Sequence, residues 1–140
     1  MSEESTTPDV VELTRQSAEA LDRGDLDATM SSYAPDVVFD LSEVGLGTFE
    51  GLEAIRGFLE DWRGSFDEIS ADFEEVLGFG HGVVLTIWSE QGRPRGSDGR
   101  VEQRRAMVTT WVGGRIKQFK AYADPDEARA AAERLAEERG

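Results

Sequence analysis

The sequence predicts an α+β fold in which helices come first and a mainly antiparallel sheet follows. Three segments rich in β-branched and aromatic residues run in succession between Gly82 and Asp124, and the last two are joined by Gly113–Gly114. A two-residue Gly-Gly loop suits a tight primed turn because both of its central positions need a positive φ. Ahead of this stretch, apolar residues recur at helical spacing in more than one place. The sheet is therefore the part around which the chain is organised.

Composition limits the classes of function. The 140 residues are expected to form one domain, 1–140, and the 29 acidic against 15 basic side chains give a net charge of −14, which disfavours nucleic acids and anionic membranes as partners. No run approaches the roughly 20 apolar residues of a membrane helix, and Met1–Thr7 is unlike a secretory signal, so we expect a cytoplasmic protein. With no cysteine and one histidine, neither a metal site nor a cofactor is expected.

The chain is expected to begin with two helices. Residues 1–6 are predicted to be disordered, and Thr7–Pro8 supplies a cap and a proline at a first helical position for a helix that ends near Arg23. Asp25 then caps a second, shorter helix. The helical spacing of that segment directs Tyr33 to the side of the apolar residues, either as a half-buried core residue or as a pocket wall.

A strand at Val37–Leu41 carries one acid among large apolar neighbours. This acid, Asp40, points either to a solvated sheet surface or into an enclosed cavity. Only the second position would raise its pKa, by desolvation of the charged form. The loop Ser42–Gly47 that follows is small and flexible, as a pocket rim or a plain connection would be.

A covering helix and a half-exposed strand come next. The helix starts at Gly51, and its apolar positions at i, i+3, i+4 and i+7 include Phe58 and Trp62. Trp62 is either core filler or a pocket wall, since a buried indole N–H needs a partner. The segment Asp67–Phe79 then alternates apolar and polar residues as a strand with one exposed face does.

Turns and a final helix complete the pattern. His81 lies between glycines and is interpreted as an exposed turn residue, and Gly92–Gly99 is a second hairpin loop, either solvated or able to bind an anion through its two arginines. The run Asp124–Glu127 gives a cap, a proline and first-turn acids, which predicts a C-terminal helix over 125–138. Its alanine-rich stripe is thin, so we expect it to lie loosely on the domain or to fray after about Leu135.

Two stretches of this order, FEGLEAIRGFLEDW and GRPRGSDGRVEQRRAMVTTWVGGRIKQFKAYADPDEA, resemble the SnoaL-like polyketide-cyclase group of the nuclear-transport-factor-two-like superfamily. The resemblance covers about Pro8 to Ala132. It implies a curved sheet wrapped as a cone around the N-terminal helices, an apolar pocket between them, and usually a homodimer through the outer face of the sheet. A shared fold leaves the reaction open.

Few of the catalytic residues known from this superfamily have counterparts in this sequence. In the ketosteroid-isomerase-like branch a base carboxylate stands on the strand that follows a segment like Tyr33–Ala34, and Asp40 falls at or next to that place. The tyrosine which that branch places on the first helix has no counterpart here, nor has the aspartate of the cyclases on the last strand, Arg115–Ala123. The Asp–Arg–Asp set of epoxide-hydrolase relatives finds two members, Asp40 and Arg104.

The favoured hypothesis is an enzyme that acts on a small, largely apolar molecule by cofactor-independent acid–base chemistry. Asp40 would be the base, with Tyr122 or Tyr33 as hydrogen-bond donor. The expected binding residues are Tyr33, Phe58, Trp62, Trp88, Arg104, Trp111 and Lys120. The alternatives are a binding domain without turnover and a purely structural dimer.

A homodimer is also expected on physical grounds. If helices cover only one face of the curved sheet, apolar residues on the outer face need a second chain as cover. Trp88, Trp111 and Phe119 are the expected candidates for that face.

Overall fold

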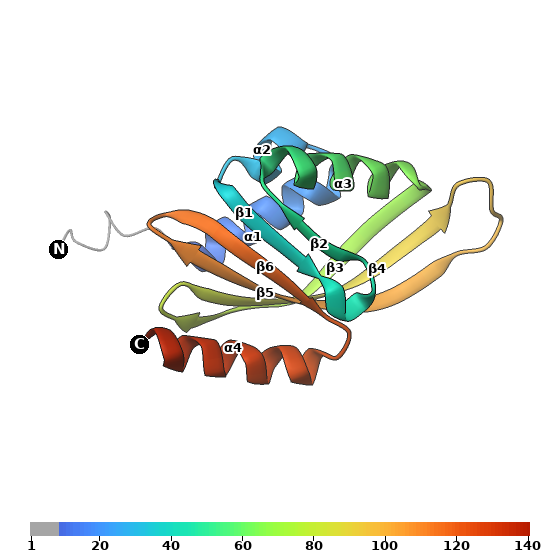
Figure 1. Ribbon diagram of the computed structural model, residues 1–140. Helices are drawn as coiled ribbons and strands as arrows, with labels where there is room; N and C mark the ends of the chain where they lie inside the picture. Colours follow the sequence, from blue (N-terminus) through green and yellow to red (C-terminus); the bar gives the residue numbers. More distant parts are fainter. Residues whose placement is uncertain (1–8) are drawn as a thin grey trace.

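The computed structural model describes residues 9–140 and has the predicted α+β architecture (Figure 1). The predictions of disorder over 1–6 and of a helix start at Thr7–Pro8 lie outside the described residues. The elements follow in the order α1 (Val10–Asp22), α2 (Leu26–Met30), β1 (Tyr33–Leu41), η2 (Ser42–Val44), β2 (Gly47–Glu50), α3 (Leu52–Gly64), β3 (Phe66–Gly80), β4 (Val83–Pro94), β5 (Val101–Val112), β6 (Arg115–Tyr122) and α4 (Pro125–Arg139).

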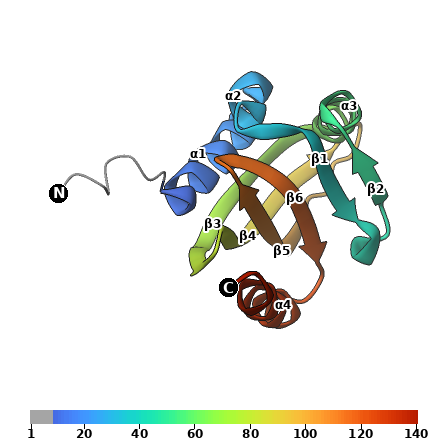
Figure 2. The same ribbon diagram turned by 60° about the vertical axis from the view of Figure 1, so that its left-hand side comes forward.

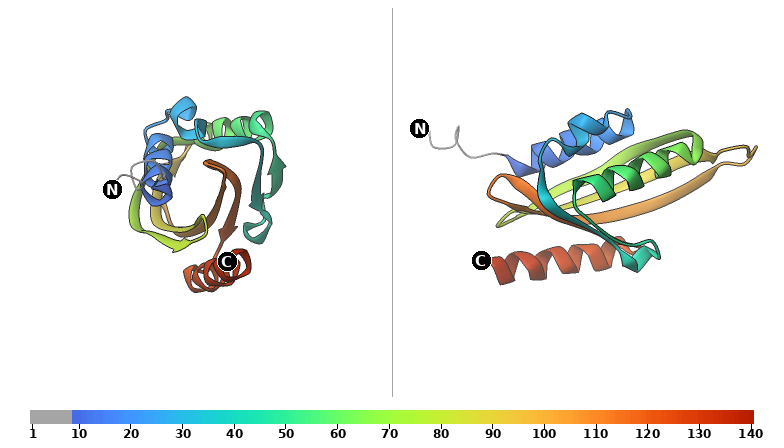
Figure 3. Two further views of the ribbon diagram at one scale, coloured as in Figure 1. Left: turned by 90° about the vertical axis from the view of Figure 1, so that its left-hand side faces the viewer. Right: turned by 45° about the horizontal axis from the view of Figure 1, so that its top comes forward.

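One six-stranded sheet runs through the molecule in the order β2-β1-β6-β5-β4-β3. The pair β1–β6 is parallel and the other four pairs are antiparallel. The sheet curves strongly without closing, so that α1, α2 and α3 lie on its inner side and α4 on its outer side (Figures 2 and 3). This arrangement confirms the predicted fold class.

Local signals in the sequence explain several boundaries. Gly113 and Gly114 have φ of 59° and 81°, as the tight turn between β5 and β6 requires. Asp25 caps α2 through a hydrogen bond from the Ala28 backbone N–H. The cap of α1 is Asp9, whose carboxylate accepts from two backbone N–H groups at 3.1 and 3.2 Å.

An irregularity in β6 decides which of its residues face inward. Thr110 pairs with Gln118, but the next residue of β5, Trp111, pairs with Ile116, so β6 carries one extra residue there, as in a β-bulge. Ile116 and Phe119 both belong to the inner core cluster as a result. A strict alternation along β6 would place only one of these two residues inside.

The C-terminal helix α4 packs closely on the outer face of the sheet. Its alanines at 128, 131, 132 and 136 are all buried, and three of them form a cluster with strand residues such as Leu85, Ile87 and Val108. Small side chains let the helix backbone approach the sheet closely, so the prediction that this helix lies loosely is wrong. The intramolecular helix supplies part of the cover that the sequence analysis assigned to a second chain.

Candidate functional site

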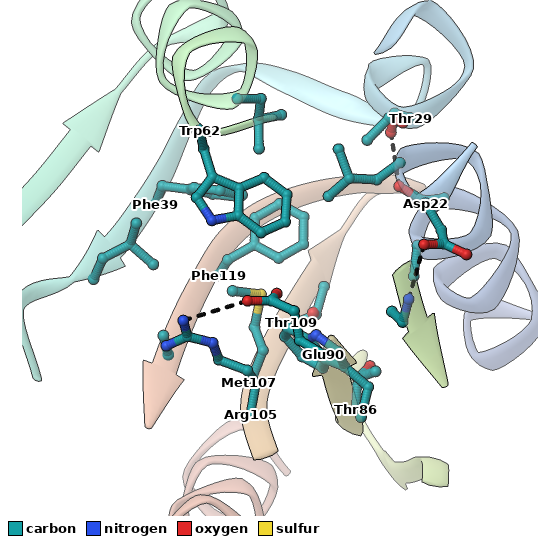
Figure 4. A pocket seen from close by; sticks show the side chains of 18 of the residues that line it. Asp22, Thr29, Phe39, Trp62, Thr86, Glu90, Arg105, Met107, Thr109 and Phe119 are labelled. Carbon is teal, nitrogen blue, oxygen red and sulfur yellow. Dashed lines mark hydrogen bonds and ion pairs between the residues drawn. The ribbon is translucent and has the colours of Figure 1, made fainter. Parts of the chain in front are cut away.

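A cavity of about 170 Å³ lies between the inner face of the sheet and the helices α1 and α3 (Figure 4). Aromatic rings form much of its lining. The Phe39 and Phe119 rings meet edge to face with centroids 4.6 Å apart, and Phe119 lies 5.0 Å from the Tyr33 ring. Trp62 and Trp88 add two indoles from α3 and β4. Such a lining favours a small, largely apolar molecule.

One carboxylate lies in this apolar lining with a cation beside it. Glu90 on β4 is 8% exposed, and one of its oxygens lies 3.4 Å from Nη2 of Arg105 on β5. Both residues line the cavity. A buried carboxylate with one long contact keeps acceptor positions available for a ligand or for proton transfer.

A second carboxylate of the lining serves the structure. The Asp22 carboxylate accepts a hydrogen bond of 2.9 Å from the backbone N–H of Ala71 on β3. The guanidinium of Arg63 on α3 donates to the Leu21 backbone oxygen at 2.6 Å. These two contacts tie the end of α1 to the sheet and to α3 beside the cavity.

Four of the predicted binding residues line the cavity, namely Tyr33, Phe58, Trp62 and Trp88. Tyr33 is 5% exposed, and burial raises the pKa of its phenol while a hydrogen bond with the Ser17 side chain lowers it by less. Its hydroxyl therefore stays neutral at physiological pH.

Tyr122 is among the residues that line the cavity, and it also packs against the cluster beneath α4 on the outer side of the sheet. Burial raises its pKa, and the nearby Lys120 opposes that rise.

Asp40 is not among the lining residues. Its carboxylate accepts hydrogen bonds from the backbone N–H and the hydroxyl of Ser42, at 3.0 and 2.6 Å. The Ser42 hydroxyl, followed by the Ser42 backbone N–H, holds the pKa of Asp40 below its ordinary value. The position in the cavity and the raised pKa predicted for it are therefore wrong, because Val37, Phe39 and Leu41 take the inner positions of β1.

The remaining three predicted residues also lie away from the lining. Nη2 of Arg104 lies 2.8 Å from Oε1 of Glu74, and Nζ of Lys120 lies 3.5 Å from Oε2 of Glu43. Trp111 is inside but belongs to the packed core, where its indole N–H donates to the Thr14 hydroxyl at 2.9 Å.

The outer-face prediction for three aromatic residues is also corrected. Trp88 lines the cavity, while Trp111 and Phe119 belong to the inner core cluster. The outer face is covered in part by α4 and carries polar pairs such as Glu74–Arg104.

Sequence reasoning missed Glu90 and Arg105. β4 continues to Pro94, so it includes Glu90 and the first residues of the expected hairpin loop Gly92–Gly99. A signal was present, because Thr86, Trp88 and Glu90 alternate on one face of that strand. Arg105 is the neighbour of the predicted Arg104, and the strand period of two places these arginines on opposite faces.

Within residues 9–140, no three His, Asp or Glu side chains gather as a metal ion would require. Over the same residues, no helix is both long and apolar enough to span a membrane.

Comparisons with solved structures agree with the cone-shaped fold. An NTF2-like protein of unknown function from Burkholderia pseudomallei matches with a TM-score of 0.73 and 21% identity, covering 86% of this chain and 95% of that one. TerC, co-crystallized with polyporic acid, matches with a TM-score of 0.72 and 17% identity, covering 89% and 98%. The chain therefore has the NTF2-like fold.

The particular family follows from the sequence itself. Residues 14–119 match the SnoaL-like domain. The uncharacterized protein Rv0034 of Mycobacterium tuberculosis is 31% identical over 119 residues, which cover 82% of this chain and 89% of that protein. The chain belongs to the SnoaL-like domain family, as the sequence resemblance indicated.

Proposed function

We propose that this protein binds a small, largely apolar ring compound in the cavity and acts on it by cofactor-independent proton transfer, with Glu90 as the acid–base group. Buried Glu90 in an aromatic lining is the observation that carries the proposal. The ligand of TerC, polyporic acid, supports a small organic molecule as the kind of ligand this fold accepts.

The cavity provides the conditions that general-base catalysis needs. A substrate held against the Trp62 and Phe119 rings is shielded from water, which strengthens the interaction between the Glu90 carboxylate and a developing charge. Glu90 would take a proton from a C–H bond beside an electron-withdrawing group and return it at another position. Arg105, 3.4 Å from the carboxylate, would orient it and stabilise negative charge on the substrate.

A general-base probe tests this role without knowledge of the natural substrate. In 5-nitrobenzisoxazole, a base takes the C3 proton, the C–H electron pair completes a nitrile, and the N–O bond breaks to release a coloured phenolate. The wild-type protein should open this ring faster than acetate at equal concentration. Glu90→Gln should remove about 10²- to 10⁴-fold of that acceleration, as the loss of a general base does.

The chain offers a matched control on the opposite face of the sheet. Glu74 pairs with Arg104 at 2.8 Å, so Glu74→Gln removes the same charge from a similar ion pair outside the cavity. This variant should keep the wild-type rate. Equal rates for wild type and Glu90→Gln would refute the proton-transfer role.

The binding domain without turnover is the second candidate. It is favoured by the Arg105 contact, because an ion pair can serve as a fixed polar anchor for a ligand. In that case the probe binds in the cavity and its ring stays closed in every variant.

The homodimer stays part of the proposal, with a changed physical basis. Beyond α4 the outer face of β3, β4 and β5 carries both signs of charge, including the pair Glu74–Arg104, and Leu77 is 38% exposed on β3. A patch that holds acids and bases together can pair with its own copy about a two-fold axis.

A further inference from the structure

The hydroxyl of Thr86, a residue of the cavity lining, lacks a hydrogen-bond partner within residues 9–140. Thr86 is 4% exposed, and its Oγ1 is buried with no donor or acceptor among those residues. It lies in the middle of β4, where the flanking Leu85 and Ile87 belong to the outer cluster beneath α4. Alternation along the strand directs the Thr86 side chain inward, and Figure 4 draws it among the lining residues.

The neighbours of Thr86 explain why its hydroxyl stays unpaired. The residues directly across from it are Val76 on β3 and Met107 on β5. Neither side chain offers an oxygen or nitrogen, and a thioether sulfur is a weak acceptor. The backbone groups of β4 are engaged in the ladders on both sides of the strand.

Two of the three other buried threonines of the lining show how a buried hydroxyl is usually paired. Thr14 and Thr29 lie on helices, and their hydroxyls donate to the backbone oxygens four residues earlier, Val10 and Asp25, at 2.6 and 2.7 Å. A helix brings that carbonyl within reach of the side chain, whereas an extended strand carries it away. Thr86 therefore has no local partner.

An unpaired buried hydroxyl is costly and uncommon, and valine would fill the same space without that cost. We infer that the Thr86 hydroxyl is the donor that recognises an acceptor oxygen on the ligand, which makes the ligand a small ring compound with a carbonyl or ether oxygen. This inference rests on the proposed function, since it assumes that the cavity binds an apolar molecule.

Thr86 and Glu90 contact different parts of that ligand. They share one face of β4 at a separation of four residues, so their Cα atoms lie about 13 Å apart along the strand. Trp88 stands between them on the same face. The acceptor oxygen and the site of proton transfer therefore lie toward different ends of the bound molecule.

The volume of the cavity sets the size of the probe. A cavity of about 150 Å³ accommodates benzene in another protein, so about 170 Å³ suits a small ring compound. Acetophenone and ethylbenzene are a suitable pair because they share a ring and a two-carbon substituent and differ in one carbonyl oxygen.

The experiment compares the affinities of both probes for wild type, Thr86→Val and Thr86→Ser by NMR titration. Wild type should bind acetophenone about five- to tenfold more tightly than Thr86→Val does. This ratio of affinities corresponds to the free energy of one hydrogen bond. Thr86→Val should lose this part of the affinity for acetophenone, while its affinity for ethylbenzene should stay equal to that of wild type or increase. Thr86→Ser retains the hydroxyl and should retain this part of the affinity.

Thermal unfolding of the ligand-free variants gives a second readout. Thr86→Val should unfold at the wild-type temperature or above it, because no described contact of the hydroxyl is lost. Thr29→Val is the matched control and should unfold at a lower temperature, since it breaks the bond to the Asp25 oxygen. A loss of stability in Thr86→Val as large as in Thr29→Val would assign the hydroxyl a structural partner and overturn the inference.

The failures of the two proposals can be told apart. If both probes bind in the cavity and Thr86→Val changes neither affinity, the inference is refuted and the proposed function stands. If neither probe binds to wild type, the proposed function is refuted and the inference falls with it.

Discussion

The hydrogen bond between Trp111 and Thr14 should couple the sheet to the helix that closes the cavity. The indole N–H donates to the Thr14 hydroxyl oxygen at 2.9 Å, and the same hydroxyl donates to the Val10 backbone oxygen at 2.6 Å. Both side chains are buried, at 3% and 5% exposure. Each partner thus has one fixed role, which makes the pair suitable for a double-mutant cycle.

The expected costs follow from these roles. Trp111→Phe removes the donor and part of a packed ring, and should lower the free energy of unfolding by about 2–3 kcal/mol. Thr14→Val leaves the indole N–H buried without its acceptor and should cost about 1–3 kcal/mol. The double variant loses the bond once, so its cost should be smaller than the sum by about 1 kcal/mol.

Urea unfolding followed by tryptophan fluorescence and circular dichroism measures the three variants. The control combines Thr14→Val with Leu85→Ala, because Leu85 packs beneath α4 on the opposite face of the sheet. That pair should be additive within about 0.5 kcal/mol. A coupling between Trp111 and Thr14 no larger than that of the control would refute the account of how α1 is attached.

Two further predictions concern the outer surface. Because Ser42 holds the pKa of Asp40 below its ordinary value, the stabilisation is present above about pH 4 and is lost as the pH falls through the lower folded pKa. Asp40→Asn should therefore lose up to about 1 kcal/mol at pH 7 and approach wild type near pH 3, and a gain of stability at pH 7 would contradict this placement. Light scattering should give about twice the chain mass of 15.4 kDa, and a monomer at micromolar concentration would exclude the proposed dimer.

The sequence predicted the architecture well because its signals are local. Gly113–Gly114 marks a hairpin through backbone geometry alone, and Asp25 marks a helix start through its capping side chain. The covering helix was recognised from apolar spacing, and its residues Phe58 and Trp62 line the cavity.

The candidate site was less predictable because strand faces depend on register. Asp40 falls on the outer face since its neighbours Phe39 and Leu41 take the core positions. The extra residue of β6 cannot be read from a period of two, because it depends on the pairing of Trp111 with Ile116. Arg104 and Arg105 are adjacent on β5, so their side chains point to opposite faces of the sheet.

Covering of the outer face was a second difficulty. The stripe of alanines in α4 has little apolar area of its own, which suggested a loosely attached helix. Its stability comes from close approach to Leu85 and Ile87, and such packing depends on the shape of both partners. The outer face of the sheet therefore needs a second chain as cover less than the sequence analysis expected.

The position of a bound ring tests the central claim most directly. In a complex with acetophenone, NMR should detect nuclear Overhauser effects between the aromatic protons of the ligand and the Met107 methyl and Ala71 methyl groups, because both residues line the cavity. Leu77, which is 38% exposed and lies outside that lining, should show none. Contacts to Leu77 with none to Met107 and Ala71 would show that the ligand binds elsewhere and would contradict the account.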